Sequence, residues 1–120
     1  MTDPTPRLQR RFYFGEAMFG PGKAQMLELI RDHGSISAAG RAMQMRYKRA
    51  WGLVEEGNAA FRDPLVDSAR GGPGGGGAPV TWAGPAALAH YRAIEAMALQ
   101  AAGPQITALQ SMLRDIPGQK

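Results

Sequence analysis

The chain has 120 residues, of which 44% are hydrophobic, enough for one domain with a modest core. It contains no cysteine, which excludes a disulfide scaffold, a thiolate zinc site and a cysteine nucleophile. The formal net charge of +4 suits a nucleic acid or another acidic partner. No apolar run approaches the ~20 residues of a membrane helix, and the N-terminus lacks the apolar core of a secretory signal. We therefore expect a cytoplasmic protein with no membrane partner.

The N-terminal third begins with polar residues and ends in a helix. Residues 1–10 carry two prolines among polar side chains, which predicts a flexible basic arm. Residues 11–19, RFYFGEAMF, are aromatic and partly alternating, which predicts one short strand. Apolar residues at helical spacing predict a helix over 23–33, with Gly34 as its C-terminal stop.

The next two helices have the order of a helix-turn-helix. Ser35 and Ser37 are each suited to capping a helix over 35–43, whose small residues permit close packing. After a break at Gln44 and Met45, a third helix is predicted over 46–61. Its inner side carries Ala50, Leu53, Val54 and Gly57. In this motif the third helix enters the major groove of DNA.

A basic face accompanies the predicted third helix. No Asp or Glu lies between His33 and Val54, but that stretch contains Arg41, Arg46, Lys48 and Arg49. The last three, with Tyr47, occupy the first helical turn, where side chains reach bases and phosphates. Arg41 lies on the middle helix, which crosses the DNA backbone. The serines Ser35 and Ser37 either cap that helix or donate to a phosphate. Which basic residue contacts bases is left open.

Six glycines and one proline fill residues 71–77, between the β-like segments LVDSA and PVTWA. No Lys follows the run, as a phosphate-binding P-loop requires, and no helix follows it directly, as a dinucleotide fingerprint requires. The run is therefore interpreted as the tip of a wing with Arg70 at its base. Glycines such as Gly72 and Gly74 let backbone N–H groups approach phosphates. The alternative is a hairpin tip that touches nothing.

Two further helices are predicted over 85–102 and 105–116, each with an apolar stripe. The stripes contain Leu88, Tyr91, Ile94, Met97, Ile106, Leu109, Met112 and Leu113. A small winged core leaves little surface to cover them, so the expected partner is the same pair of helices in a second copy. Met26, Met97 and Met112 lie on apolar stripes and are predicted to be core residues rather than metal ligands.

Taken together, the segments GSISAAGRAM, MRYKRAW and LVDSARGGPGGGGAPVTWAG resemble the N-terminal DNA-binding domain of the molybdate-responsive ModE-type regulators, relatives of the LysR type. The resemblance covers about residues 18–97. Its most specific parts are the YK-x-AW motif, Tyr47 to Trp51, and the glycine-rich wing. It implies a winged helix-turn-helix that dimerises through its long helix, binds a palindromic operator and regulates molybdenum-related genes. Arg46 departs from the Ser or Thr that the family usually places there.

Full-length members of that family continue into domains that sense molybdate, for which this chain has no room before Lys120. We therefore expect no direct molybdate binding. His33 and His90 are far apart and lack carboxylate company, so no metal, no cofactor and no catalytic residues are predicted.

The predicted fold is mainly α with a small β-hairpin wing. It comprises a flexible basic arm (1–10), a winged helix-turn-helix (11–82) and a helical dimerisation region (83–120). The predicted function is that of a regulator, not an enzyme, that binds double-stranded DNA as a homodimer, with its two third helices roughly 34–36 Å apart. One alternative is a protein-interaction module that modulates another regulator. The other is a regulator with a small ligand in a buried polar pocket at the dimer interface, among residues 85–116.

Overall fold

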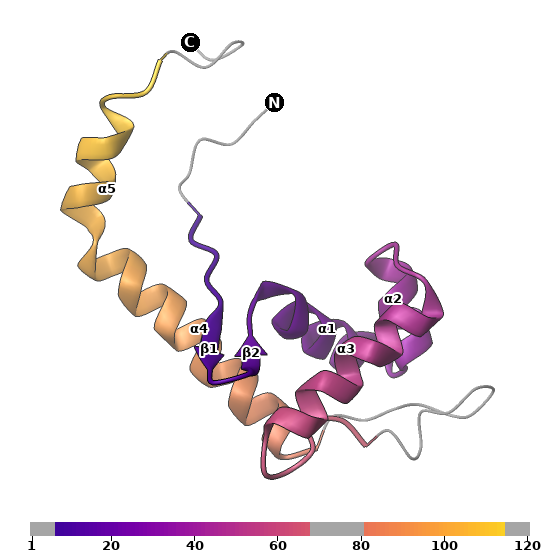
Figure 1. The fold of residues 1–120 in the computed structure, drawn as a ribbon. Coiled ribbons are helices and arrows are strands. Elements are labelled where there is room, and N and C mark those ends of the chain that lie inside the picture. The colour runs from indigo at the N-terminus through magenta and orange to yellow at the C-terminus, as the bar shows by residue number, and fades with distance from the viewer. Residues whose placement is uncertain (1–6, 68–80, 115–120) are drawn as a thin grey trace.

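A computed structural model describes residues 7–67 and 81–114 of the chain. These ranges contain five helices and one two-stranded antiparallel hairpin, so the prediction of a mainly α fold with a small β component is confirmed (Figure 1). In chain order the elements are β1 (Phe12–Phe14), β2 (Ala17–Phe19), α1 (Pro21–His33), α2 (Ile36–Ala42), α3 (Tyr47–Ala60), α4 (Ala83–Ala101) and α5 (Gly103–Gln110).

The hairpin of β1 and β2 replaces the single strand that was predicted over residues 11–19, so that prediction was wrong. Gly15 interrupts the aromatic run with a φ of +66°, a conformation that glycine adopts without steric cost, and the chain reverses there. The register pairs Phe12 with Phe19 and Tyr13 with Met18. This hairpin precedes the helices and is separate from the predicted wing, whose residues 68–80 lie outside the described ranges.

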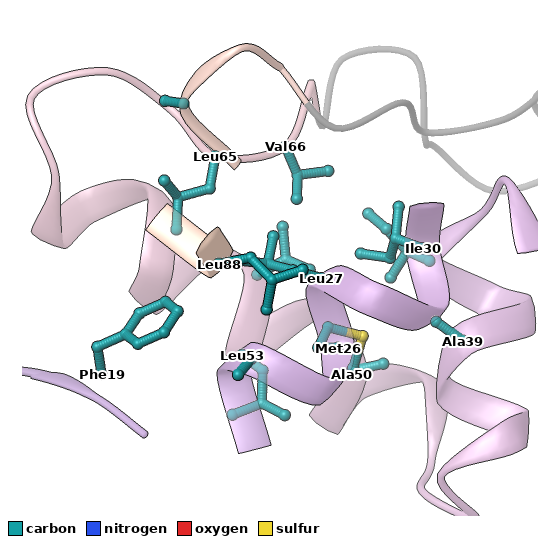
Figure 2. Close-up of a cluster of buried hydrophobic side chains, with 14 of the residues drawn as sticks. Phe19, Met26, Leu27, Ile30, Ala39, Ala50, Leu53, Leu65, Val66 and Leu88 are labelled. Atoms are coloured by element: carbon teal, nitrogen blue, oxygen red, sulfur yellow. The ribbon is translucent and has the colours of Figure 1, made fainter. Parts of the chain in front are cut away.

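The core lies between α1, α2 and α3, and the start of α4 closes it (Figure 2). It contains the inner residues predicted for the third helix, Ala50, Leu53 and Val54, all of which are buried. The other fully or nearly buried apolar side chains are Phe19, Ala24, Met26, Leu27, Ile30, Ile36, Ala39, Leu65, Val66, Ala83, Leu88 and Tyr91. The three helices of the predicted helix-turn-helix therefore pack around one apolar cluster.

The last two helices leave this core (Figure 1). α4 is buried at Leu88 and Tyr91, but Met97 is 67% exposed, and α5 has no buried residue at all. The prediction of core positions is confirmed for Met26 and wrong for Met97 and for Met112, which is 80% exposed. Periodicity identified an apolar stripe correctly, but residues 7–67 and 81–114 leave much of it exposed. The last helix also ends at Gln110, earlier than the predicted residue 116.

Candidate nucleic-acid interface

The contact between α2 and α3 is unusually close because Gly40 faces Ala50. A Cβ placed on Gly40 would lie 2.9 Å from the Cβ of Ala50, nearer than two carbon atoms normally approach. Ala50 is fully buried at this contact. The missing side chain of Gly40 therefore sets how near the axis of α3 lies to that of α2.

The turn between these helices is closed by two backbone hydrogen bonds. Gln44 N donates to Arg41 O and Met45 N donates to Gly40 O, each at 3.0 Å. This is the Schellman pattern, which places one residue in the left-handed region. Gln44 occupies that place with a φ of +58°. The predicted break at Gln44 and Met45 is thus confirmed.

α3 presents its basic first turn to solvent. Arg46 is the N-cap residue and makes no side-chain capping bond, while Tyr47, Lys48 and Arg49 are exposed. At about 100° per residue, Lys48 lies on the side of α3 opposite the buried Ala50. Arg41, in the last turn of α2, is also exposed.

We call Arg41, Arg46, Lys48 and Arg49 the basic cluster. Within the described residues, no carboxylate lies at ion-pair distance from any of the four. The nearest acidic residues along α3, Glu55 and Glu56, come two turns later. Of these two, Glu56 places its Oε1 3.3 Å from Nζ of the buried Lys23 in α1. No carboxylate among residues 7–67 and 81–114 therefore neutralises the basic cluster through an ion pair.

The two serines have different roles in the structure. Ser35 is the N-cap residue of α2, where its Oγ accepts a hydrogen bond from Ala38 N at 3.0 Å. This confirms the prediction that at least one of the two caps the helix. Ser37 lies in the first turn of α2 and is partly exposed.

Tyr47 packs against another aromatic residue of the same helix. Its ring meets that of Trp51 edge-on, with centroids 6.0 Å apart. Trp51 in turn packs against the hydrophobic core, and its buried Nε1 has no hydrogen-bond partner in the described part of the chain. The Trp51 ring therefore restricts the orientation of Tyr47 beside the basic cluster.

Near the far end of α3, Asn58 holds the segment that leads to the predicted wing. Its Oδ1 accepts from Leu65 N at 2.9 Å and from Val66 N at 3.1 Å, and its Nδ2 donates to Val66 O at 3.0 Å. Thr81 N donates to Leu65 O at 3.1 Å, so the two ends of that segment meet beside α3. The predicted DNA contacts Arg70, Gly72 and Gly74 lie outside the described residues.

No role was predicted for Asn58 or Lys23, and for Gln44 only the break between the helices was predicted. A weak signal existed for Asn58, because Asn is unfavourable inside a helix unless its side chain bonds elsewhere. The partners of Asn58 and Lys23 lie on other segments of the chain, so the spacing of residues in the sequence does not predict these contacts.

α4 is anchored to the helix-turn-helix by a bidentate ion pair. Arg92 Nη2 lies 2.7 Å from Glu28 Oε1 of α1, Nε lies 3.1 Å from Glu28 Oε2, and Nη1 bonds Glu95 at 2.8 Å. These hydrogen bonds, chiefly those to Glu28, raise the pKa of Arg92 above its usual value. The adjacent Tyr91 donates its hydroxyl to Arg10 O at 2.6 Å. The direction of α4 is thus fixed relative to α1.

An open apolar groove of about 340 Å³ runs between the hairpin and the first half of α4. We call it the aromatic groove. Its lining residues are Phe12, Phe14, Phe19, Phe61, Ala87, His90, Tyr91 and Ile94. It is open and apolar, unlike the buried polar pocket that the ligand-sensing alternative expected. Of the predicted dimerisation residues, Leu88 and Tyr91 are buried in the core and Ile106 is partly exposed. Ile94, Met97, Leu109, Met112 and Leu113 are all more than 40% exposed.

Residues 7–67 and 81–114 contain no group of three or more His, Cys, Asp or Glu placed to hold a metal ion. None of the helices described is both long enough and apolar enough to cross a membrane.

Comparison with known proteins identifies several relatives, although no protein-family model matches the chain. The molybdenum-pterin-binding protein MopA of Rhodobacter capsulatus is 39% identical over 89 residues, which are 74% of this chain and 34% of MopA. MopB of the same organism, also named as a molybdenum-pterin-binding protein, is 44% identical over 80 residues, 67% of this chain and 30% of MopB.

A third relative is the DNA-binding transcriptional dual regulator ModE of Escherichia coli (strain K12), which is 39% identical over 61 residues, 51% of this chain and 23% of ModE. The chain thus spans between 23% and 34% of the length of these three relatives. The names of the three are those of a regulator and of molybdenum-pterin-binding proteins. The resemblance that the motifs predicted is confirmed: over half to three quarters of its length, the chain is a homologue of the ModE-type regulators and of MopA and MopB.

Proposed function

We propose that the chain is a transcription regulator that binds a palindromic DNA operator as a homodimer. The observation that carries this proposal is the basic cluster: four exposed cations on the last turn of α2 and the start of α3, with no carboxylate partner in the part of the chain that the structure describes. In a helix-turn-helix these are the positions that face the DNA backbone and the major groove. Homology to a protein named as a DNA-binding regulator supports the same function.

The position of the charges along α3 also favours a DNA partner. The N-terminus of a helix carries partial positive charge, so Lys48 and Arg49 stand where the free protein least favours cations. Phosphates placed there would relieve this repulsion. Glu55, two turns further along the same side of α3 as Lys48, would repel a phosphate instead. We therefore propose that α3 enters the groove by its N-terminal turn, with Arg46, Tyr47, Lys48 and Arg49 as contacts.

The remaining predicted DNA contacts are Arg41, the two serines and the wing residues, and each is supported by a different observation. Arg41 is exposed beside the cluster and is proposed to bind a phosphate. The Oγ of Ser35 already caps α2, so we propose that Ser35 orients the N-terminus of α2 toward the DNA backbone. Ser37, in the first turn of α2, is proposed to lie beside the same stretch of DNA backbone. The wing residues Arg70, Gly72 and Gly74 are kept as proposed phosphate contacts, on the argument from their sequence alone.

The exposed stripe of α4 and α5 supports the homodimer. If two α4 helices cross antiparallel near residue 98, the first half of each α4 lies toward the end of the partner's α4 and the α5 that follows it. The aromatic groove beside Ala87 and Ile94 would then receive α5 of the partner subunit. Leu109, Met112 and Leu113, exposed here, would be covered. This keeps residues 83–120 as the proposed dimerisation region and 11–82 as the DNA-binding domain.

Regulation of molybdenum-related genes is proposed from the relatives' names. The proposed contacts use cationic and hydroxyl side chains toward DNA, and we expect molybdate to leave DNA binding unchanged. Since MopA and MopB are named for binding molybdenum-pterin, molybdate belongs in the test as a separate arm.

The function is tested by selecting bound fragments from a genomic DNA pool at two salt concentrations, with and without molybdate. Enrichment of a short inverted repeat is the expected result. Lys48→Ala should weaken binding about 5- to 30-fold and reduce the slope of log affinity against log salt by about one. The matched control is Arg62→Ala, an exposed cation just past the end of α3 at Ala60, which lies about 18 Å of helical rise from Lys48; this variant should change binding less than twofold.

Sequence-blind binding, or none, would refute the regulator. The protein-interaction module would then be favoured, since the exposed stripe of α4 and α5 suits a protein partner as well as a second copy. A change of operator affinity with molybdate would refute the expectation that the chain does not respond to it.

The dimer is tested by cross-linking, for which a chain without cysteine is well suited. Met97→Cys lies near the proposed crossing and should form a covalent dimer on mild oxidation. Ala96→Cys, exposed but turned by about 100° around α4, should not. Equal cross-linking of the two variants, or a monomer in sedimentation at micromolar concentration, would refute this arrangement.

A further inference from the structure

Gln44 has a backbone conformation that its residue type disfavours. It is the one non-glycine residue with positive φ among residues 7–67 and 81–114. The hydrogen bonds that close the turn from Arg41 and Gly40 require this conformation. Glycine adopts it without the clash between Cβ and the backbone that other residues experience. Gln44 therefore destabilises the turn relative to glycine.

No contact within residues 7–67 and 81–114 compensates for glutamine at this position. The Gln44 side chain is exposed, and the described part of the chain offers its amide no hydrogen-bond partner. Asn and Asp tolerate this region because their short side chains bond to the nearby backbone, but the longer Gln is poorly suited to that. Residues held in disfavoured backbone conformations are concentrated at functional sites.

The position of Gln44 indicates what its amide meets. The residue lies between Arg41, to whose carbonyl its own N–H is bonded, and Arg46, the N-cap of α3. It is thus flanked on both sides by members of the basic cluster. An uncharged amide supplies N–H donors at this point without adding a further cation to the cluster.

We propose that the side-chain amide of Gln44 donates a hydrogen bond to a phosphate of the DNA backbone and so positions α3 in the groove. This inference rests on the proposed function and adds a contact that the basic residues do not supply. A phosphate contact fixes register and orientation but carries no base information. Gln44 therefore contributes equally at every sequence to which the protein docks in this way.

Two variants separate the contact from the strain. Gln44→Gly removes both the amide and the strain, so its Tm should rise by about 3–6 °C. Gln44→Ala removes the amide but keeps a Cβ in the left-handed region, so its Tm should stay close to that of the wild type. Both should bind the selected operator about 3- to 10-fold more weakly, the effect of one hydrogen bond. The salt slope should not change, because no charge is lost.

The outcomes distinguish this inference from the function beneath it. Wild-type protein that selects no DNA overturns both. If the wild type selects an operator and both variants bind it within twofold, only the role of Gln44 is overturned. Weaker binding by Gln44→Gly alone would assign the effect to turn flexibility. A loss confined to one base position, measured with single-base operator variants, would replace the phosphate by a base edge. Either result overturns the proposed contact.

Discussion

Asn58→Ala should be among the most damaging single substitutions in this fold, although the residue is polar and only partly buried. Its side-chain amide forms three hydrogen bonds with the backbone of residues 65 and 66, two accepted and one donated, as a neighbouring β-strand would. Leu65 and Val66 are 3% and 2% exposed, so water does not reach the backbone groups that alanine would leave unpaired.

The size of the effect follows from those three bonds. Each intramolecular hydrogen bond contributes about 1 kcal/mol, and each buried group left without a partner adds to the loss, so the free energy of unfolding should fall by about 3 kcal/mol. Since whole domains are stable by about 5–15 kcal/mol, this is a large fraction. The corresponding fall in Tm is roughly 10–15 °C.

Urea unfolding followed by circular dichroism measures this loss, at a fixed protein concentration because association would add to stability. Asn58→Asp is the matched variant: it keeps the acceptor for Leu65 N and Val66 N but loses the donor to Val66 O. It should be intermediate between wild type and Asn58→Ala. A loss below about 1 kcal/mol for alanine would show that the backbone of residues 65 and 66 finds other partners, and would refute the reasoning.

Three other substitutions test the contact of α2 with α3, the helix propensity of α3 and the burial of Tyr91 in α4. Gly40→Ala forces the Cβ contact with Ala50 and should destabilise the fold by about 1–3 kcal/mol in the same assay; adding Ala50→Gly should restore part of the loss, and no restoration would refute the contact. Gly52→Ala adds a methyl group to α3 where no atom lies within 4 Å, and should raise stability by about 1 kcal/mol in urea unfolding. Burial, with a contribution from Glu95, raises the pKa of Tyr91 above its usual 10. The unfolded chain then ionises at lower pH than the folded one, so this stability is fully present below pH 10 and is lost as pH rises toward the folded pKa. Tyr91→Phe should remove that alkaline loss in thermal melts recorded from pH 8 to 11, and an unchanged profile would contradict the assignment.

The helix-turn-helix was predictable from sequence because its signals are local. Ser35 caps α2 as expected, Gly34 ends α1 with a φ of +82°, and the inner residues of α3 are buried. The hairpin was missed because its aromatic residues masked the reversal at Gly15. A run of strand-forming residues predicts one continuous strand, and a single glycine within the run is a weak signal for a turn.

The candidate site was predictable in its charges but not in its supports. A gap in acidic residues indicated the basic cluster, and in the structure those cations are exposed and have no ion-pair partner among the described residues. The contact of Gly40 with Ala50 and the bonds of Asn58 join residues whose proximity depends on the folded chain. Likewise, the stripe containing Met97 shows that an apolar face exists, but its periodicity does not say whether the same chain or another one covers it.

The exposure of Met97 and Met112 gives the long helices a chemical sensitivity. In a chain without cysteine, methionine sulfur is the side-chain atom most easily oxidised. Met26 is buried, whereas these two are 67% and 80% exposed on the stripe of α4 and α5. In a monomer, peroxide would convert Met97 and Met112 into polar sulfoxides and leave the core intact. A second copy seated on this stripe would shield the sulfurs, so the rate of their oxidation becomes a measure of how long each chain spends alone.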